Sequence, residues 1–184
     1  MISQILKEKT KSLHDDLEEQ FQSSKIFDKT YTLENYRKLI HFNYLFLLNF
    51  EDGVFNAFSP EIAEKLNIEK RRKLSLIEKD LSPLNIEKSE LQNHPDIKNE
   101  AEAFGFLYVM EGSTLGGNII AKQLSKNPEF QNISFNYFNC YGDETGFLWK
   151  NFKETLDESI SENQYEDVLN GANKAFEFLL ELFN

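Results

Sequence analysis

The sequence contains very little cysteine and proline. Cys140 is the only cysteine among 184 residues. This excludes an internal disulfide, a cysteine-rich zinc or iron–sulfur site, and a prosthetic group attached through paired cysteines. The four prolines contrast with 17 phenylalanines and seven tyrosines. Such a composition is typical of a helical protein with an aromatic core, and it is not that of a disordered chain.

Positive charge is also scarce. Lysine and arginine together number 20 against 31 acidic residues, so the formal net charge is −11. A nucleic-acid substrate is not expected, because phosphate neutralisation needs a concentrated basic face. The one basic cluster, Lys70 to Lys73, is interpreted as a solvated helix face. The alternative is a docking patch for an acidic redox partner.

Long apolar runs are absent as well. No stretch of 18 apolar residues occurs, and the first residues, MISQILKEKTKSLHDD, lack the apolar core of a signal peptide. We therefore expect no membrane partner and a cytoplasmic location.

Apolar residues recur every three or four positions along most of the chain, which predicts amphipathic helices. Thr32 is suited to cap a long aromatic helix, and Ser59-Pro60 is suited to end it. The aromatic stretch from Phe130 to Tyr141 has no sustained period and is expected to be irregular. The predicted fold class is all-α, a single domain (residues 1–184) built as a bundle of about seven helices. The expected helices cover residues 3–21, 32–58, 61–81 in two pieces joined near Asn67, 95–127, 144–160 and 163–183.

The stretch from Ala101 to Leu124 is apolar enough for a buried helix, yet it contains Gly105, Gly112, Gly116 and Gly117. Each glycine inside a helix costs about 1 kcal/mol relative to alanine. Positions 105, 112 and 116 are seven and four residues apart, so they are predicted to share one helical face. Such a face allows close contact with another helix or with a large flat ligand, and the spacing leaves both open.

Three histidines are present, and His14 has the most suggestive surroundings. Lys7 lies seven residues before it, about 10 Å along a helix axis and on nearly the same face. This roughly matches the distance from the iron of a haem to its propionate carboxylates, so an imidazole on the metal and an ammonium near the acids make a sensible pair. An interfacial histidine with an unrelated lysine is the alternative. His41 is expected to be a core or boundary residue, and His94 a surface residue.

The acidic residues give little support to paired-carboxylate hydrolysis. Asp15-Asp16 and Glu18-Glu19 form a charge run on a helix, which is expected to be solvated. Glu111 lies within the apolar stretch and must find a donor or a ligand, because an unpaired buried carboxylate is costly. Structural ion pairing is the expected solution. The sequence contains no H-E-x-x-H, G-x-S-x-G or phosphate-binding glycine motif.

Three separated stretches resemble one family. They read LKEKTKSLHDDLE (Leu6–Glu18), YVMEGSTLGGNII (Tyr108–Ile120) and FNCYGDETGFLWKNFKETL (Phe138–Leu156). Together they look like the haem oxygenases, specifically the bacterial branch that produces biliverdin. The final ANKAFEFLLELF is similar to the last helix of that family.

The resemblance implies roles for several residues around a b-type haem that is both cofactor and substrate. His14 matches the histidine that binds the iron, Lys7 a propionate contact, and Glu18 the acidic residue that orients the first helix. Gly112 and Gly116 match the glycines at which the distal helix bends across the haem, and Gly117 adjoins them. Many members carry an aspartate where this chain has Ser113, which can hold a water but carries no negative charge. Further haem contacts are expected from Lys150 and Lys153.

The reaction implied is the opening of haem by O2 and reducing equivalents to biliverdin, carbon monoxide and ferrous iron. Its expected partners are haem and an electron donor, either a protein or a small reductant. The main alternative is a haem carrier, store or sensor without turnover, which Ser113 keeps open. Two weaker hypotheses are a relative that acts on a thiamine-type pyrimidine through Cys140, and a scaffold without haem.

Overall fold

Every regular element in residues 1–90 and 96–184, which the structure describes, is a helix. The structure is a computed structural model, and it confirms the predicted all-α class. The α-helices are α1 (Ile2–Lys9), α2 (Lys11–Gln20), α3 (Ser24–Phe27), α4 (Leu33–Asn56), α5 (Pro60–Leu66), α6 (Ile68–Arg71), α7 (Leu74–Leu81), α8 (Glu100–Leu115), α9 (Gly117–Leu124), α10 (Thr145–Ser159) and α11 (Tyr165–Glu181). None of these helices combines the length and the apolar character needed to span a membrane.

The long helix α4 begins where the sequence predicts. The Thr32 side chain accepts a hydrogen bond from the Asn35 amide, and the Asn35 side chain accepts one from the Thr32 amide. This reciprocal pair satisfies two backbone donors that would otherwise lack partners at the helix start. The joint expected near Asn67 is also present, since Asn67 adopts a left-handed conformation (φ 53°) between α5 and α6.

The predicted first helix is bent into two, α1 and α2. The bend is at Thr10, whose backbone (φ −94°, ψ 1°) leaves the helical range. The Thr10 hydroxyl donates to the carbonyl of Leu6 at 2.8 Å, a bond that competes with regular helix geometry. Because the bend falls between Lys7 and His14, these two residues do not share one straight helix face.

The glycine-bearing stretch also forms two helices, α8 and α9. Helix α8 begins at Glu100, because the Asn99 side chain caps it by accepting from the Glu102 amide at 2.9 Å. The start expected at Pro95 lies outside the described residues, and Asp96 precedes α8. The break between α8 and α9 is at Gly116 (φ −85°, ψ −1°), so the glycine-bearing stretch is interrupted at a glycine.

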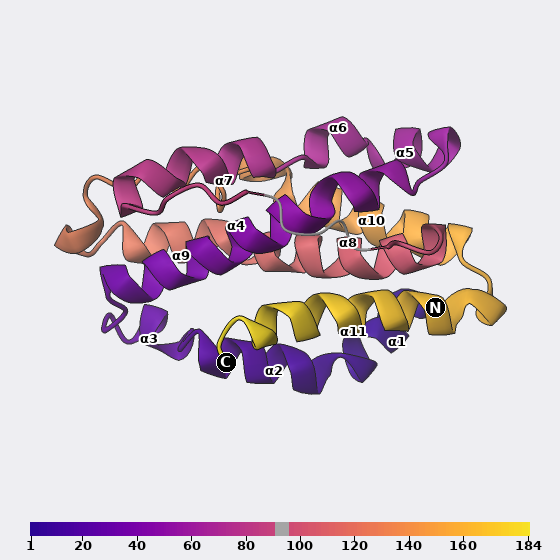
Figure 1. Ribbon diagram of the computed structural model, residues 1–184, viewed down its shortest axis with the longest axis horizontal. Helices are drawn as coiled ribbons and strands as arrows, with labels where there is room; N and C mark the ends of the chain where they lie inside the picture. Colours follow the sequence, from indigo (N-terminus) through magenta and orange to yellow (C-terminus); the bar gives the residue numbers. More distant parts are fainter. Residues whose placement is uncertain (91–95) are drawn as a thin grey trace.

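Helices α8 and α9 run through the middle of the molecule (Figure 1). Helices α4, α10 and α11 all pack against α8, and α2 packs on the other side of α11. The pairs Asn99–Asp167 and Gly105–Ala172 show that α8 and α11 run in the same direction, as the chain colours in Figure 1 also indicate. Helix α11 therefore contacts both segments that carry the predicted haem residues, α2 and α8.

Helices α8 and α11 cross with their backbones in direct contact. A Cβ atom on Gly105 would lie 2.1 Å from the Val168 carbonyl oxygen, and one on Gly171 would lie 2.1 Å from the Glu102 carbonyl oxygen. Only glycine permits this approach of the two backbones. Gly105 thus serves helix packing, one of the two uses that the glycine spacing leaves open, whereas the Cβ positions of Gly112 and Gly116 are not covered in this way.

Candidate functional site

His14 lies on the outer part of α2 with an exposed imidazole. Its Nδ1 atom is 3.9 Å from a carboxylate oxygen of both Asp15 and Glu18, and its ring meets the edge of Phe176 on α11 with centroids 6.3 Å apart. The two acidic neighbours lie on the Nδ1 side, so Nε2 is the nitrogen left for a metal. The three ligand-type side chains lie together as an exposed group, and the structure brings His14 and Glu18 together as the sequence predicts.

The glycines divide into two kinds. A Cβ atom on Gly112 or Gly116 would meet no atom within 4 Å other than those of the adjoining helix backbone and the two chain neighbours. On Gly117 it would lie 2.5 Å from the Phe138 carbonyl oxygen, so this buried glycine packs against protein. The Cβ side of Gly117 is filled by Phe138, and a haem contact from Gly117 stays a prediction. Of the glycines in α8 and α9 and at their junction, Gly112 and Gly116 border open space.

Gly112 and His14 both lie beyond the point at which α8 crosses α11. Gly112 is seven residues, about 10 Å, beyond Gly105, where α8 crosses α11 at Ala172. Phe176 is four residues, about 6 Å, beyond Ala172 in the same direction. Since the His14 ring packs on Phe176, a candidate metal ligand and an open backbone surface lie on the same side of this crossing.

Exposed apolar side chains accompany this open surface. Leu115 and Ile119 are 41% and 56% exposed on α8 and α9, and Phe147 is 68% exposed near the start of α10. Asn118 links α9 to that start, because it donates to the Gly142 carbonyl at 2.7 Å. Such apolar exposure beside a glycine surface suits a large hydrophobic ligand.

Ser113 belongs to a buried hydrogen-bonded chain. Its hydroxyl is 2.7 Å from the Tyr137 hydroxyl, which donates to the Asn43 side-chain oxygen at 3.0 Å. Burial raises the pKa of Tyr137 above its ordinary value, so this hydroxyl remains protonated at neutral pH. Because its proton is directed to Asn43, Ser113 donates to Tyr137 or to the Met110 carbonyl and keeps a lone pair for a water.

Glu111 has the structural ion pairs that the sequence predicts. Its carboxylate, 2% exposed, is bound by Arg71 and Lys73 and by the Tyr141 hydroxyl at 2.7 Å. Arg71 also donates to the Leu148 carbonyl at 2.9 Å. Buried charges are tolerated when they are paired and hydrogen-bonded in this way.

The basic cluster at 70–73 is not a solvated face, and that prediction is wrong. Arg71 and Lys73 are 0% and 1% exposed. Lys70 pairs with Glu144 at 2.6 Å, and Arg72 pairs with Asp52 at 2.7 Å. Because all four side chains of the cluster form ion pairs with acidic residues of the same chain, the cluster does not provide a free patch for an acidic redox partner either.

Of the three lysines predicted to contact haem, Lys7 and Lys150 are exposed and Lys153 is half-buried. Lys7 is exposed on α1. Lys150 pairs with Glu154 at 3.6 Å, and the Lys153 ammonium lies 5.9 Å from the Trp149 ring centroid. Haem contacts from these lysines stay a prediction. His41 is half-buried on α4, as expected, and His94 lies outside the described residues.

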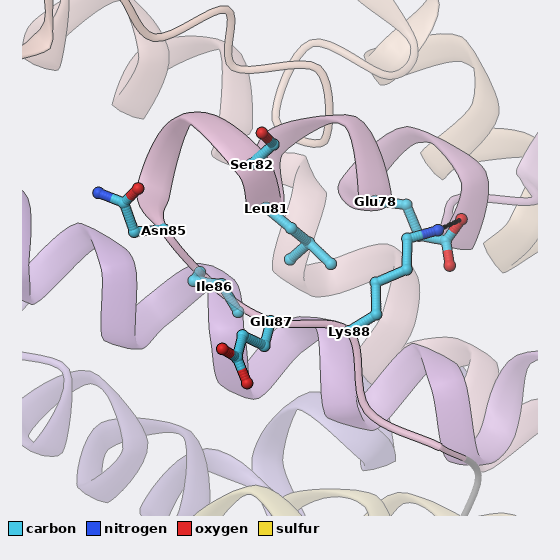
Figure 2. Close-up of a pocket in the computed structure, with 7 residues that line it drawn as sticks. All are labelled: Glu78, Leu81, Ser82, Asn85, Ile86, Glu87 and Lys88. Atoms are coloured by element: carbon cyan, nitrogen blue, oxygen red, sulfur yellow. Dashed lines mark ion pairs between the residues drawn. The ribbon is translucent and has the colours of Figure 1, made fainter.

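A surface pocket of about 380 Å³ lies elsewhere, between α7 and the segment that follows it. Figure 2 shows the Lys88 side chain reaching back to Glu78, with which it pairs at 2.9 Å, while Asn85 and Glu87 point outward. This pocket contains neither His14 nor the open glycines, and its lining offers no metal-binding histidine or cysteine. Helices α2, α8 and α9 therefore remain the candidate functional site.

Comparison with known proteins shows the family of this chain. The sequence profile of one family, described as "Heme oxygenase", matches residues 1–184. The chain belongs to the haem oxygenase family. It is also similar to a curated heme oxygenase from Xanthomonas campestris pv. campestris (strain 8004), with 32% identity over 107 residues. That match covers 58% of this chain and 64% of the Xanthomonas protein, which is less than two thirds of its length.

The fold is that of a solved haem oxygenase. Crystal structures of the NO- and CO-bound heme oxygenase from Neisseria meningitidis superpose on this chain with a TM-score of 0.73. The superposition covers 100% of this chain and 90% of the Neisseria chain, at 22% sequence identity. The predicted likeness to the haem oxygenase fold is confirmed.

Proposed function

We propose that this protein is an active haem oxygenase that binds haem between His14 and the backbone at Gly112 and Gly116. The observation that carries the proposal is the open side of these two glycines. A helix gains about 1 kcal/mol when an interior glycine becomes alanine. Protein packing does not explain why glycine occupies these two positions, because their Cβ positions are open. A ligand that lies directly against the helix backbone does explain it.

The residues present fit a haem. His14 offers Nε2, while Glu18 lies where it can hold the proton on Nδ1 and keep the ring orientation fixed. The edge of Phe176 restricts the imidazole from the α11 side. Leu115 and Ile119 supply apolar surface for the flat ring. Lys7, Lys150 and Lys153 are the cations proposed to reach the propionates.

Bound haem, with O2 and electrons from a protein or small reductant, supplies the oxidation that opens its own ring at a meso carbon, giving biliverdin, carbon monoxide and ferrous iron. The chain's own contribution is positional. The backbone at Gly112 and Gly116 excludes bulk water from one face of the ring, and Ser113 accepts a hydrogen bond from a water on that face. Without a carboxylate here, proton transfer depends on water oriented by the Ser113 hydroxyl.

The test is a haem titration of the purified protein, followed by ascorbate in air and monitored by visible absorbance. We expect a saturable Soret band that decays as a biliverdin band rises. His14→Ala should change the Soret spectrum and abolish most turnover, whereas the matched variant His41→Gln should retain both. An unchanged spectrum in His14→Ala would exclude His14 as the iron ligand.

A haem carrier, store or sensor is the second candidate, favoured by the absence of a distal carboxylate at Ser113. It predicts a Soret band that persists under reductant. A thiamine-type chemistry at Cys140 has less support, because burial raises the pKa of this thiol and keeps it protonated. Absence of any Soret band would refute both haem-based functions.

A further inference from the structure

We infer that the segment from Tyr137 to Gly142 is a brace that positions Gly112 over the haem, with Tyr137 and Tyr141 as its positioning residues. The inference rests on the proposed function for the meaning of that position. The brace itself is defined by contacts between this segment and the α8–α9 bend.

The two tyrosines reach the two residues that flank Gly112. The Tyr141 hydroxyl donates to the Glu111 carboxylate at 2.7 Å, and the Tyr137 hydroxyl is 2.7 Å from Ser113 Oγ. In a helix, neighbours of a residue are turned about 100° to either side of it. The side chains of Glu111 and Ser113 are thus held on both sides of Gly112, while its own face stays open.

The same segment supports the rest of the bend. Phe138 presents its backbone to Gly117, where even a Cβ atom would not fit. The Gly142 carbonyl accepts from the Asn118 side chain at 2.7 Å. Contacts therefore run from Glu111 to Asn118, on both sides of the break at Gly116.

The brace is in turn anchored in the core. Asp80 accepts hydrogen bonds from the amide of Tyr137 at 2.8 Å and from the amide of Asn136 at 3.0 Å. Lys73, which binds Glu111, also lies 5.0 Å from the Tyr141 ring centroid. Asp80 on α7 and Lys73 just before α7 thus fix the position of the segment. Its two tyrosines are therefore held in place where they contact α8.

Both hydroxyls are suited to a fixed role. Burial, together with the negative charge of Glu111, raises the pKa of Tyr141, and burial raises that of Tyr137. Each therefore remains a neutral donor across the physiological range. Loss of either hydroxyl removes one contact beside Gly112 and keeps the aromatic ring in the core.

This arrangement has a consequence for the direction of ring opening. The backbone at Gly112 and Gly116 limits the space above the haem, so a shift of this backbone changes which meso carbon is accessible. We expect Tyr137→Phe and Tyr141→Phe to convert a dominant biliverdin isomer into a mixture. Tyr31→Phe is the matched control, because Tyr31 is a buried tyrosine whose hydroxyl donates to the Asn35 carbonyl outside the bend.

The experiment combines two measurements. Hydrogen exchange of the haem-free proteins should show amides of residues 112–117 exchanging about threefold to tenfold faster in both bend variants than in wild type or Tyr31→Phe, as expected for the loss of one hydrogen bond. Chromatography of the biliverdin isomers then reports the position of the backbone over haem. Thermal melts verify that all three variants fold.

The outcomes separate the brace from the proposed function. Faster exchange with an altered isomer ratio supports the inference. Exchange unchanged from wild type overturns it, as does faster exchange with an unaltered isomer ratio. If wild type opens no haem, the proposed function fails, and the brace is decided by the exchange measurement alone.

Discussion

Gly105 and Gly112 lie seven residues apart on α8, yet alanine should affect them in opposite directions. At Gly112 the added methyl group meets no atom within 4 Å other than those of the adjoining helix backbone and the two chain neighbours. The substitution therefore keeps the helical preference of alanine, about 1 kcal/mol in favour of the folded state. For a protein of this size that corresponds to a rise in Tm of about 2–4 °C.

At Gly105 the same methyl group would lie 2.1 Å from the Val168 carbonyl oxygen and 2.5 Å from the Ala172 amide nitrogen. Both are backbone atoms and cannot rotate away, so α8 and α11 must separate. Overpacking of this kind costs about 1–3 kcal/mol or more. Because α11 also contacts α2, we expect a loss near the upper end of that range, even after the helical gain.

The assay is thermal unfolding of the haem-free variants by circular dichroism, combined with haem turnover. Gly112→Ala should melt above wild type, and Gly112→Leu should fold but fail to open haem. Gly105→Ala should melt several degrees below wild type. A Gly112→Ala protein as destabilised as Gly105→Ala would refute the assignment of open space. Wild-type turnover in Gly112→Leu and in Gly116→Leu would show that this space does not face haem.

Two further predictions concern stability. Glu111→Leu leaves Arg71 and Lys73 buried without their carboxylate, which should cost about 3–5 kcal/mol in urea unfolding; a loss below about 1 kcal/mol would contradict the buried ion pairs. Burial and then the charge of Arg37 lower the pKa of His41 from 6.5. Below pH 6.5, His41 takes up a proton more readily in the unfolded chain than in the folded protein. The free energy of unfolding should therefore decrease as the pH decreases, and it should decrease less steeply in His41→Gln. Equal slopes for the two proteins below pH 6.5 would refute this effect.

Local patterns were sufficient for the helices and for part of the site. The repeat of apolar residues identifies α4, α10 and α11 within a few residues, and Thr32 marks the start of α4 as a cap. His14 and Glu18 are one turn apart on a helix, so their proximity follows from spacing alone. The glycines at 112 and 116 can also be picked out from the sequence. Glycine destabilises a helix, so its presence there indicates a contact that the helix makes with something else.

The same patterns misjudge residues whose role depends on a partner elsewhere in the chain. Spacing places Gly105 with Gly112, yet α11 covers the first and leaves the second open. Four consecutive basic residues indicate a solvated face, but Glu111, 38 residues after Lys73, holds Lys73 and Arg71 in the core. A signal was present, since Glu111 in an apolar stretch requires cations and this cluster is the concentrated source of them.

The sequence by itself determined the all-helical class and most helix boundaries, because each depends on residues within a turn or two of one another. Its resemblance to the haem oxygenases named the candidate iron ligand and the glycines proposed to border the haem. The tertiary structure alone decided which glycine faces protein and which faces open space, and it brought Tyr137 and Tyr141 to either side of Gly112. The physical reason is that a helix repeats the same surface pattern whatever packs against it. Only the packing of distant segments selects which part of that surface remains free to bind.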